Sequence, residues 1–253
     1  MKYVHAWAGI VALLVAWQLA TYLWSIPEWL LPSPVDVATA LWSYKTQLPR
    51  HVGVTLYETA AGFAIAVLVG VPLGVLLVSS MFVWRALYPI IAGIQSIPKT
   101  ALAPLLLVWI GAGYLPQIII AFLVSFFPIV VNTATGMMAV EQGLIDVLRS
   151  ICASRWQIIW RIRFPSALPY IFGACKVAVT LATIGAVIGE FVGSDAGLGY
   201  MILAASSQLK TSLAFVCILI LSALGMALFW LVSILERIFV PWALPSQELR
   251  QQI

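Results

Sequence analysis

The chain has 253 residues, of which 63% are hydrophobic and only 9% charged, and its mean hydropathy is +1.06. An average soluble domain is about 25% charged, so the composition argues against a soluble enzyme and indicates a protein whose solvent is lipid. The net charge of +4 would suit a nucleic-acid partner. We exclude that partner, because the basic residues fall mainly in short segments between apolar runs, as membrane orientation requires.

Six apolar segments are long enough to cross a hydrocarbon core, which takes about 20 apolar residues in a helix. In chain order they are residues 4–23, 55–79, 88–110, 116–137, 169–190 and 212–239. We therefore predict an all-α integral membrane protein with six transmembrane helices in a single domain, residues 1–253. The first segment is longer than a signal-peptide core and lacks a clear cleavage site, so we expect it to be a retained helix.

Between the first two segments, residues 35–44 are expected to form a short helix on the outer surface. Ser33 can cap it and Pro34 can occupy its first turn. Trp24, Trp29 and Trp42 suit the membrane interface.

The distribution of basic residues predicts the orientation. If the amino terminus is cytoplasmic, eight of the 13 lie inside, three lie outside, and Lys99 and Lys176 lie in or near spans. The inner residues are Lys2, Arg85, Arg149, Arg155, Arg161, Arg163, Arg237 and Arg250, and the outer ones are Lys45, Arg50 and Lys210. The positive-inside rule therefore places both termini in the cytoplasm.

The longest inner connection, residues 143–169, is expected to form two short helices with a turn between them. Residues 144–151 mix apolar and charged side chains, as a stub that docks in a partner's groove does. Ser154 and Gln157 have capping-box spacing, so a second helix should begin there. Pro165 and Pro169 are expected to end it before the fifth span.

This connection resembles the EAA loop of permease subunits in ATP-binding-cassette (ABC) importers. Asp146 takes the acid position, Val147 and Leu148 the two alanines, Cys152 the glycine, and Phe164-Pro165 the Leu-Pro pair. Other motifs recur in order: Leu31-Pro32-Ser33-Pro34, Thr55-Leu56, Gly62-Phe63, Ile97-Pro98-Lys99, Ala103-Pro104-Leu105, Trp109-Ile110-Gly111, Phe126-Phe127-Pro128, Asn132-Thr133, Gly189-Glu190 and Gly197-Leu198-Gly199. Together they are similar to the nitrate, sulfonate and taurine branch of these permeases over residues 31–200.

The resemblance implies a type I importer bundle in a bacterial inner membrane, paired with a second copy of itself. It also implies two ABC ATPase subunits that bind ATP and Mg²⁺, and a periplasmic or lipid-anchored substrate-binding protein. The chain itself would carry no cofactor, metal or catalytic residue. The ATPase-coupling residues would be Asp146, Arg149, Ser150, Cys152, Ala153, Ser154 and Arg155.

Two residues depart from the family pattern. Cys152 stands where glycine is expected, and glycine accepts positive φ more readily than cysteine. Glu58 stands where relatives commonly carry arginine, and we expect it at an outer interfacial depth. The glycine-rich residues 193–199 lack the Gly-Lys-Ser/Thr of a nucleotide-binding loop and read as an outer turn.

Polar residues in or near the spans are candidates for lining the translocation path: Gln95, Ser96, Lys99, Asn132 and Glu190. Each has an alternative. Glu190 can line the outer mouth or be an interfacial carboxylate that reaches water. Lys99 can attract an anionic substrate, or it can snorkel or form a structural ion pair. Gln95, Ser96 and Asn132 can instead bond between helices, and Lys176 is explained by snorkelling.

An ion-coupled secondary transporter is the main alternative, but midspan acids and a convincing repeat are missing. A serine hydrolase lacks a base, since only His5 and His51 exist, near opposite membrane faces. Cys152, Cys175 and Cys217 have no metal or redox spacing and read as free thiols. The cargo stays open between a small anion, such as nitrate, a sulfonate or taurine, and a vitamin precursor, such as a thiamine pyrimidine or riboflavin. We expect residues 146–154 to act as the lever that moves the spans.

Overall fold

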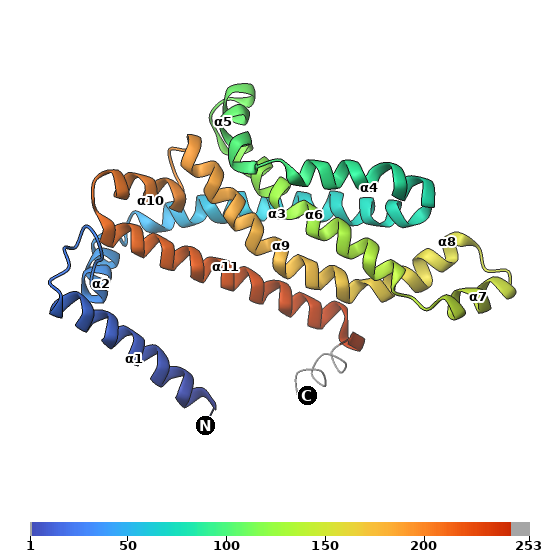
Figure 1. Cartoon of the computed structure of the whole chain (residues 1–253), viewed down its shortest axis with the longest axis horizontal. Helices are drawn as coiled ribbons and strands as arrows, with labels where there is room; N and C mark the ends of the chain where they lie inside the picture. Colours follow the sequence, from blue (N-terminus) through green and yellow to red (C-terminus); the bar gives the residue numbers. More distant parts are fainter. Residues whose placement is uncertain (1, 244–253) are drawn as a thin grey trace.

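The computed structural model describes residues 2–243, and over that range the chain is helical with no β-strand. Four long helices run roughly along the longest axis of the molecule (Figure 1). They are α3 (Leu48–Ser79), α6 (Tyr114–Met138), α9 (Phe164–Gly193) and α11 (Thr211–Phe239). α6 packs against both α3 and α9, and α11 packs against α9.

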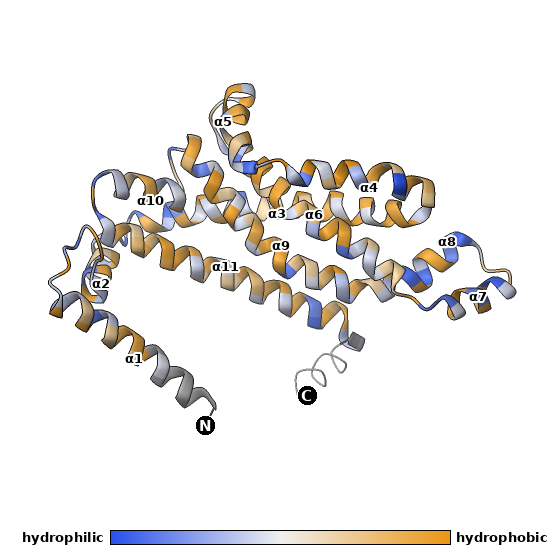
Figure 2. Cartoon of the chain, in the orientation of Figure 1, coloured by the Kyte–Doolittle hydropathy of each residue, from blue (hydrophilic) through white to orange (hydrophobic). Residues whose placement is uncertain are grey.

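Shorter elements occupy the two ends of this bundle. At one end lie α2 (Pro34–Ser43) and α10 (Leu198–Ser207), and at the other lie α7 (Gln142–Ser150) and α8 (Arg155–Ile158). α1 (Lys2–Leu23) leads away from the bundle, and a 3-10 turn, η2 (Pro241–Ala243), follows α11. Figure 2 shows that apolar residues cover the long helices, while many hydrophilic ones gather around α7 and α8.

Four predicted spans are confirmed as helices long and apolar enough to cross a membrane: α3, α6, the continuous stretch Arg155–Gly193 and α11. The predicted span 88–110 is wrong as a single helix. It is divided into α4 (Met81–Ser96) and α5 (Lys99–Ile110), which meet at 88°. Among the described residues, α1 counts only as a shorter apolar helix, Val11–Leu23, so the total of six spans stays a prediction.

Proline causes the break between α4 and α5. Pro98 provides no amide for the helical ladder and disfavours helical backbone at the residue before it. Ile97 accordingly has an extended conformation, with φ −69° and ψ 127°.

Pro165 and Pro169 do not end the helix that begins at Arg155, so that prediction is wrong. A π-helical turn, η1 (Ile159–Arg163), links α8 to α9, and the amide of Phe164 bonds to the carbonyl of Ile159. Pro165 follows this π turn in the first turn of α9, and Pro169 lies inside the same helix. The α7–α8 end is therefore joined to α9 without a break.

Glycines allow α3 to approach α6 closely, as expected for a membrane bundle. A Cβ added to Gly62, Gly70 or Gly74 would lie 2.5, 3.0 or 2.6 Å from side-chain atoms of α6. Since the three glycines share one face of α3, the two backbones meet along most of their length.

The helix predicted over residues 35–44 is confirmed as α2, Pro34–Ser43. Ser33 and Asp36 form a reciprocal capping box, and Pro34 occupies the first turn.

Candidate functional site

The predicted inner loop forms two helical segments with a tight turn between them. α7 ends at Ser150, and α8 begins after Ser154. The Ser154 hydroxyl accepts a bond from the Gln157 amide, and Gln157 Oε1 accepts one from the Ser154 amide at 2.7 Å. The predicted capping box is therefore confirmed, and it fixes where α8 starts.

Cys152 lies in the turn with φ +60°, in the left-handed region. Its amide donates to the carbonyl of Arg149 at 2.9 Å, and the Ala153 amide donates to that of Leu148 at 3.0 Å. These bonds satisfy carbonyls at the end of α7. The cysteine thus holds the conformation that glycine adopts at less cost, and its thiol is free and exposed.

α7 is anchored by one side chain and presents the others. Ile145 is 2% exposed, whereas Val147 and Ile151 are 60% and 70% exposed. Asp146 and Arg149 form an exposed ion pair at 3.3 Å. Exposed apolar side chains among charges are typical of a surface that docks on a partner. The predicted coupling residues Asp146, Arg149, Ser150, Cys152, Ser154 and Arg155 are exposed, and Ala153 is half-buried.

An ion pair fastens α9 to α11 near this end of the bundle. The Lys176 amine contacts the Glu236 carboxylate, and their side chains are only 19% and 7% exposed. The snorkelling interpretation of Lys176 is therefore wrong. The pair therefore links α9 to α11.

Three of the predicted path residues, Gln95, Ser96 and Lys99, gather at the bend between α4 and α5. The Lys99 amine donates to the Gln95 carbonyl, which the broken helix leaves free. The Ser96 hydroxyl bonds to the carbonyl of Ala92 at 3.2 Å. These polar side chains bond to carbonyls at and near the bend.

Asn132 lies on α6 and bonds within its own helix. Its amide donates to the Pro128 carbonyl at 2.8 Å. No described hydrogen bond joins Asn132 to the residues at the bend or to Glu190.

Glu190 is 1% exposed, so its interpretation as an interfacial carboxylate that reaches water is wrong, and its place in the translocation path stays a prediction. Its Oε1 accepts from the Thr55 hydroxyl at 2.6 Å, and its other oxygen accepts from the Gly199 amide. Glu58 has no exposed surface, and its outer interfacial depth stays a prediction. Sequence reasoning missed this buried cluster, although Thr55, Glu58, Thr59 and Gly62 have the spacing of one helix face.

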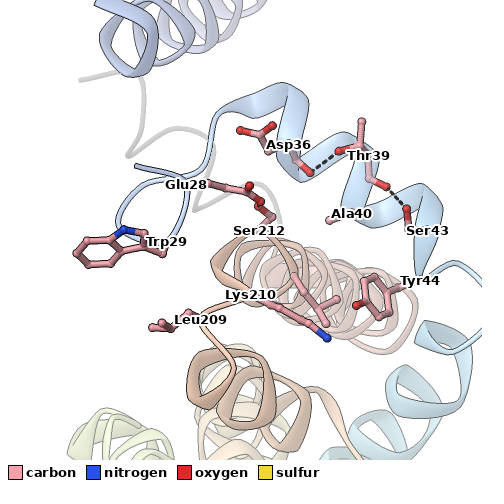
Figure 3. A pocket seen from close by; sticks show the side chains of 11 residues that line it. Glu28, Trp29, Asp36, Thr39, Ala40, Ser43, Tyr44, Leu209, Lys210 and Ser212 are labelled. Atoms are coloured by element: carbon pink, nitrogen blue, oxygen red, sulfur yellow. Dashed lines mark hydrogen bonds between the residues drawn. The ribbon is translucent and has the colours of Figure 1, made fainter. Parts of the chain in front are cut away.

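A polar pocket of about 500 Å³ lies at the opposite end from α7 and α8 (Figure 3). Its walls come from the segment after α1, from α2 and from the start of α11. Glu28 accepts from the Ser212 hydroxyl at 2.6 Å, and the Thr211 hydroxyl donates to the Trp29 carbonyl at 2.6 Å. Since these partners lie more than 180 residues apart, no local sequence pattern predicts the pocket.

The family described as "Binding-protein-dependent transport system inner membrane component" matches residues 62–240, which include α6 to α9 and the α7–α8 turn. The chain belongs to this family. This transport component is similar to a riboflavin transport system permease protein of Chloroflexus aurantiacus, with 36% identity over 92% of this chain and 88% of that protein. It is 33% identical to a formylaminopyrimidine transport permease protein of Halalkalibacterium halodurans, over 91% of this chain and 92% of that protein.

A solved structure supports the fold of this transport component. An inward-facing chain of the MetNI methionine ABC transporter matches it with a TM-score of 0.63 and 21% identity. The match covers 76% of this chain and 97% of that chain.

The transport component is the permease subunit of an ABC importer and a multi-pass membrane protein, a class that is not enzymatic. Sulfonate, nitrate and taurine permeases are also among its relatives, as the sequence motifs indicated. The ion-coupled alternative is therefore set aside.

Proposed function

We propose that the α7–α8 turn receives the stroke of a separate ATPase subunit, which holds the ATP and Mg²⁺. The observation that carries the proposal is a helix end that exposes Val147 and Ile151 beside an exposed ion pair. Burial of such side chains in a partner's groove stabilises docking by the hydrophobic effect.

The turn is well built to pass on a movement. Arg155 to Gly193 is helical throughout, so a shift of the α7–α8 turn displaces α9. Lys176 and Glu236 carry that displacement to α11. Rigid rotation of the helices then alternates access to the path.

The permease is proposed to pair with a second copy of itself. α1 leads away from the bundle and exposes apolar side chains such as Leu13, Leu19 and Leu23. α9 and α11 border an open groove of about 870 Å³ with an apolar lining. A second copy would cover part of this surface, and a substrate-binding protein would dock at the end that carries the polar pocket.

The α7–α8 end is proposed to be cytoplasmic. Among the described side chains, arginines dominate that end of the bundle: Arg85, Arg149, Arg155, Arg161, Arg163 and Arg237. The opposite end carries Lys45, Arg50 and Lys210. This asymmetry follows the positive-inside rule.

For the cargo we propose a vitamin precursor with a heteroaromatic ring, of the riboflavin or pyrimidine class. Relatives with those names are 36% and 33% identical, against 28% for the taurine permease. The α9–α11 groove presents Phe191, Phe229 and Trp230 and contains no basic residue. Aromatic faces favour a planar ring, whereas an anion would find no positive charge there.

The coupling proposal is tested with Val147→Glu and Arg149→Glu, each reconstituted with the ATPase. Both are expected to reduce copurification of the ATPase and ATP-dependent uptake, because a new carboxylate must be desolvated in the groove. Ser207→Glu is the control for ATPase copurification, since Ser207 is exposed on α10 at the opposite end. Normal assembly and uptake in both test variants would defeat the assignment.

The cargo is tested in proteoliposomes that contain the ATPase and the binding protein. Riboflavin and a formylaminopyrimidine are compared with taurine and nitrate as stimulants of ATPase activity. Stimulation by a vitamin precursor alone is expected, and stimulation by an anion alone contradicts this choice while leaving the coupling role intact.

A further inference from the structure

Two carboxyl groups lie side by side inside the bundle, near the end that carries α10. Glu58 of α3 and Glu190 of α9 are 0% and 1% exposed. The Thr55 hydroxyl, one turn before Glu58 on α3, bonds to Glu190 at 2.6 Å, so Glu58 lies beside Glu190. Neither belongs to the α7–α8 turn or to the groove. A pair of ionised carboxylates in such a place would repel and would both be desolvated.

Glu190 is surrounded by donors. The Thr55 hydroxyl donates to it at 2.6 Å, and the backbone amide of Gly199 donates to it from the first turn of α10. A helix N-terminus and charge-assisted bonds both favour an anion. Glu190 is therefore suited to remain ionised.

The glycines of the Gly197-Leu198-Gly199 turn make this arrangement possible. A Cβ on Gly199 would lie 2.7 Å from Oε2 of Glu190. The Leu198 amide bonds to the Thr55 hydroxyl at 2.9 Å, so the turn is wrapped around the carboxylate. The glycine-rich turn therefore leaves room for the buried carboxylate of Glu190.

Glu58 has the opposite surroundings. Neither of its oxygens has a hydrogen-bond donor, and the nearby helix face adds the unpartnered Thr59 hydroxyl. Across the interface, Gln117 of α6 leaves its own carbonyl oxygen unpartnered. A carboxylate without donors is unstable in this setting, whereas a neutral carboxyl can donate to Glu190.

Among the described residues, no cation pairs with these acids. The two ion pairs there use Asp146 and Glu236. The other titratable groups that face the pair are His51, whose ring accepts from the Gly197 amide, Tyr200, stacked on His51, and Cys217 of α11.

We propose that Glu58 and Glu190 form a proton-binding site that fastens α10 to α3 and α9. One proton resides on Glu58 and is donated to the ionised Glu190, so that the pair carries a single negative charge. The site holds the α9–α10 turn closed around Glu190. Loss of the proton leaves two buried like charges and loosens α10.

The direct test is infrared spectroscopy of the full-length permease in lipid nanodiscs at neutral pH. The wild type is expected to give the carbonyl band of a neutral carboxylic acid, shifted in D₂O. Glu58→Gln is expected to lose the band. Asp195→Asn, a matched change at an exposed acid in the same turn, is expected to keep it.

Thermal unfolding over a pH series is the second measurement. The folded wild type holds a proton that unfolded chain releases at neutral pH, so its stability should fall as the pH rises into the alkaline range. Glu58→Gln should be as stable as the wild type at neutral pH and lose this part of the pH dependence. Glu190→Gln should be less stable, because α10 loses its anionic cap.

Two results would overturn the proposal. One is a wild-type spectrum without a neutral carboxyl band that is sensitive to D₂O, which can be judged even if the variants fail to fold. The other is stability that depends on Na⁺ or K⁺ at constant pH, since a metal cation would then hold the pair.

Discussion

At Cys152 a residue with a side chain occupies a left-handed backbone position, φ +60°. Such a conformation costs an ordinary residue about 1–2 kcal/mol. Cys152→Gly is expected to preserve ATPase binding and uptake, because glycine removes the strain although it adds disorder to the unfolded chain.

Cys152→Val is the contrasting change, because β-branched residues tolerate positive φ poorly. Relative to the glycine variant, it should weaken ATPase binding by roughly 5- to 30-fold, if 1–2 kcal/mol of strain opposes the docked turn. Titration of the reconstituted permease with ATPase measures both variants. Equal affinity of the valine and glycine variants would contradict this account of the turn.

The sequence indicated the coupling turn at residue scale but misjudged several polar side chains. Ser154 and Gln157 are a local pair, and their capping box was predictable from spacing alone. The partners of the misjudged side chains lie on other helices. Glu58 lies beside Glu190, Lys176 pairs with Glu236, and Glu190 accepts a hydrogen bond from Thr55. The position of a residue within its own apolar segment could not reveal those partners.

At the scale of the elements, α3 and α6 depend on the absence of a side chain at Gly62. A Cβ there would lie 2.5 Å from the Ala121 Cβ and 2.9 Å from the Ile118 carbonyl oxygen. Gly62→Ala should lower the free energy of unfolding by about 1–3 kcal/mol through overpacking. Gly53→Ala in the same helix is the control, because nothing lies within 4 Å of a Cβ at that position. Thermal unfolding in lipid compares the two, and equal stability would refute close packing at Gly62.

The Lys176–Glu236 pair allows a second test of helix association. Lys176→Met leaves the Glu236 carboxylate without its partner in a site that is 7% exposed, and should cost about 3–5 kcal/mol. Replacement of both residues, by methionine and leucine, should recover most of that loss. A double-mutant cycle on unfolding free energies measures this coupling, and simple additivity of the two single effects would exclude it.

Helix boundaries were predictable where chain-local chemistry decides them. The Pro98 break was visible only as a proline within an apolar run, and the same signal at Pro128 accompanies an uninterrupted α6. Pro165 was misread because it follows a π turn and falls in the first turn of α9, and Pro169 lies inside α9 without ending it. Proline marks where a helix can bend, and tertiary packing decides whether it does.

For the whole molecule, the length and hydropathy of the apolar segments predicted the fold class and four of the spans, because each long apolar helix is identified by its own residues. The packing order of those helices and the course of α1 depend on contacts between distant segments. The sequence therefore predicted the family and the coupling turn, but it did not predict how the helices of the bundle pack.

Orientation of the whole molecule can be tested with its own thiols. Cys152 is exposed, while Cys175 and Cys217 are buried. A membrane-impermeant maleimide should label Cys152 in inside-out vesicles and leave right-side-out vesicles unlabelled. Ser207→Cys in a Cys152→Ser background should give the reverse pattern, because α10 lies at the opposite end of the bundle. Labelling of Cys152 from the outside would contradict the proposed topology. Added ATPase should protect Cys152 from the maleimide, because docking buries the turn, and should leave labelling of the Ser207→Cys variant unchanged.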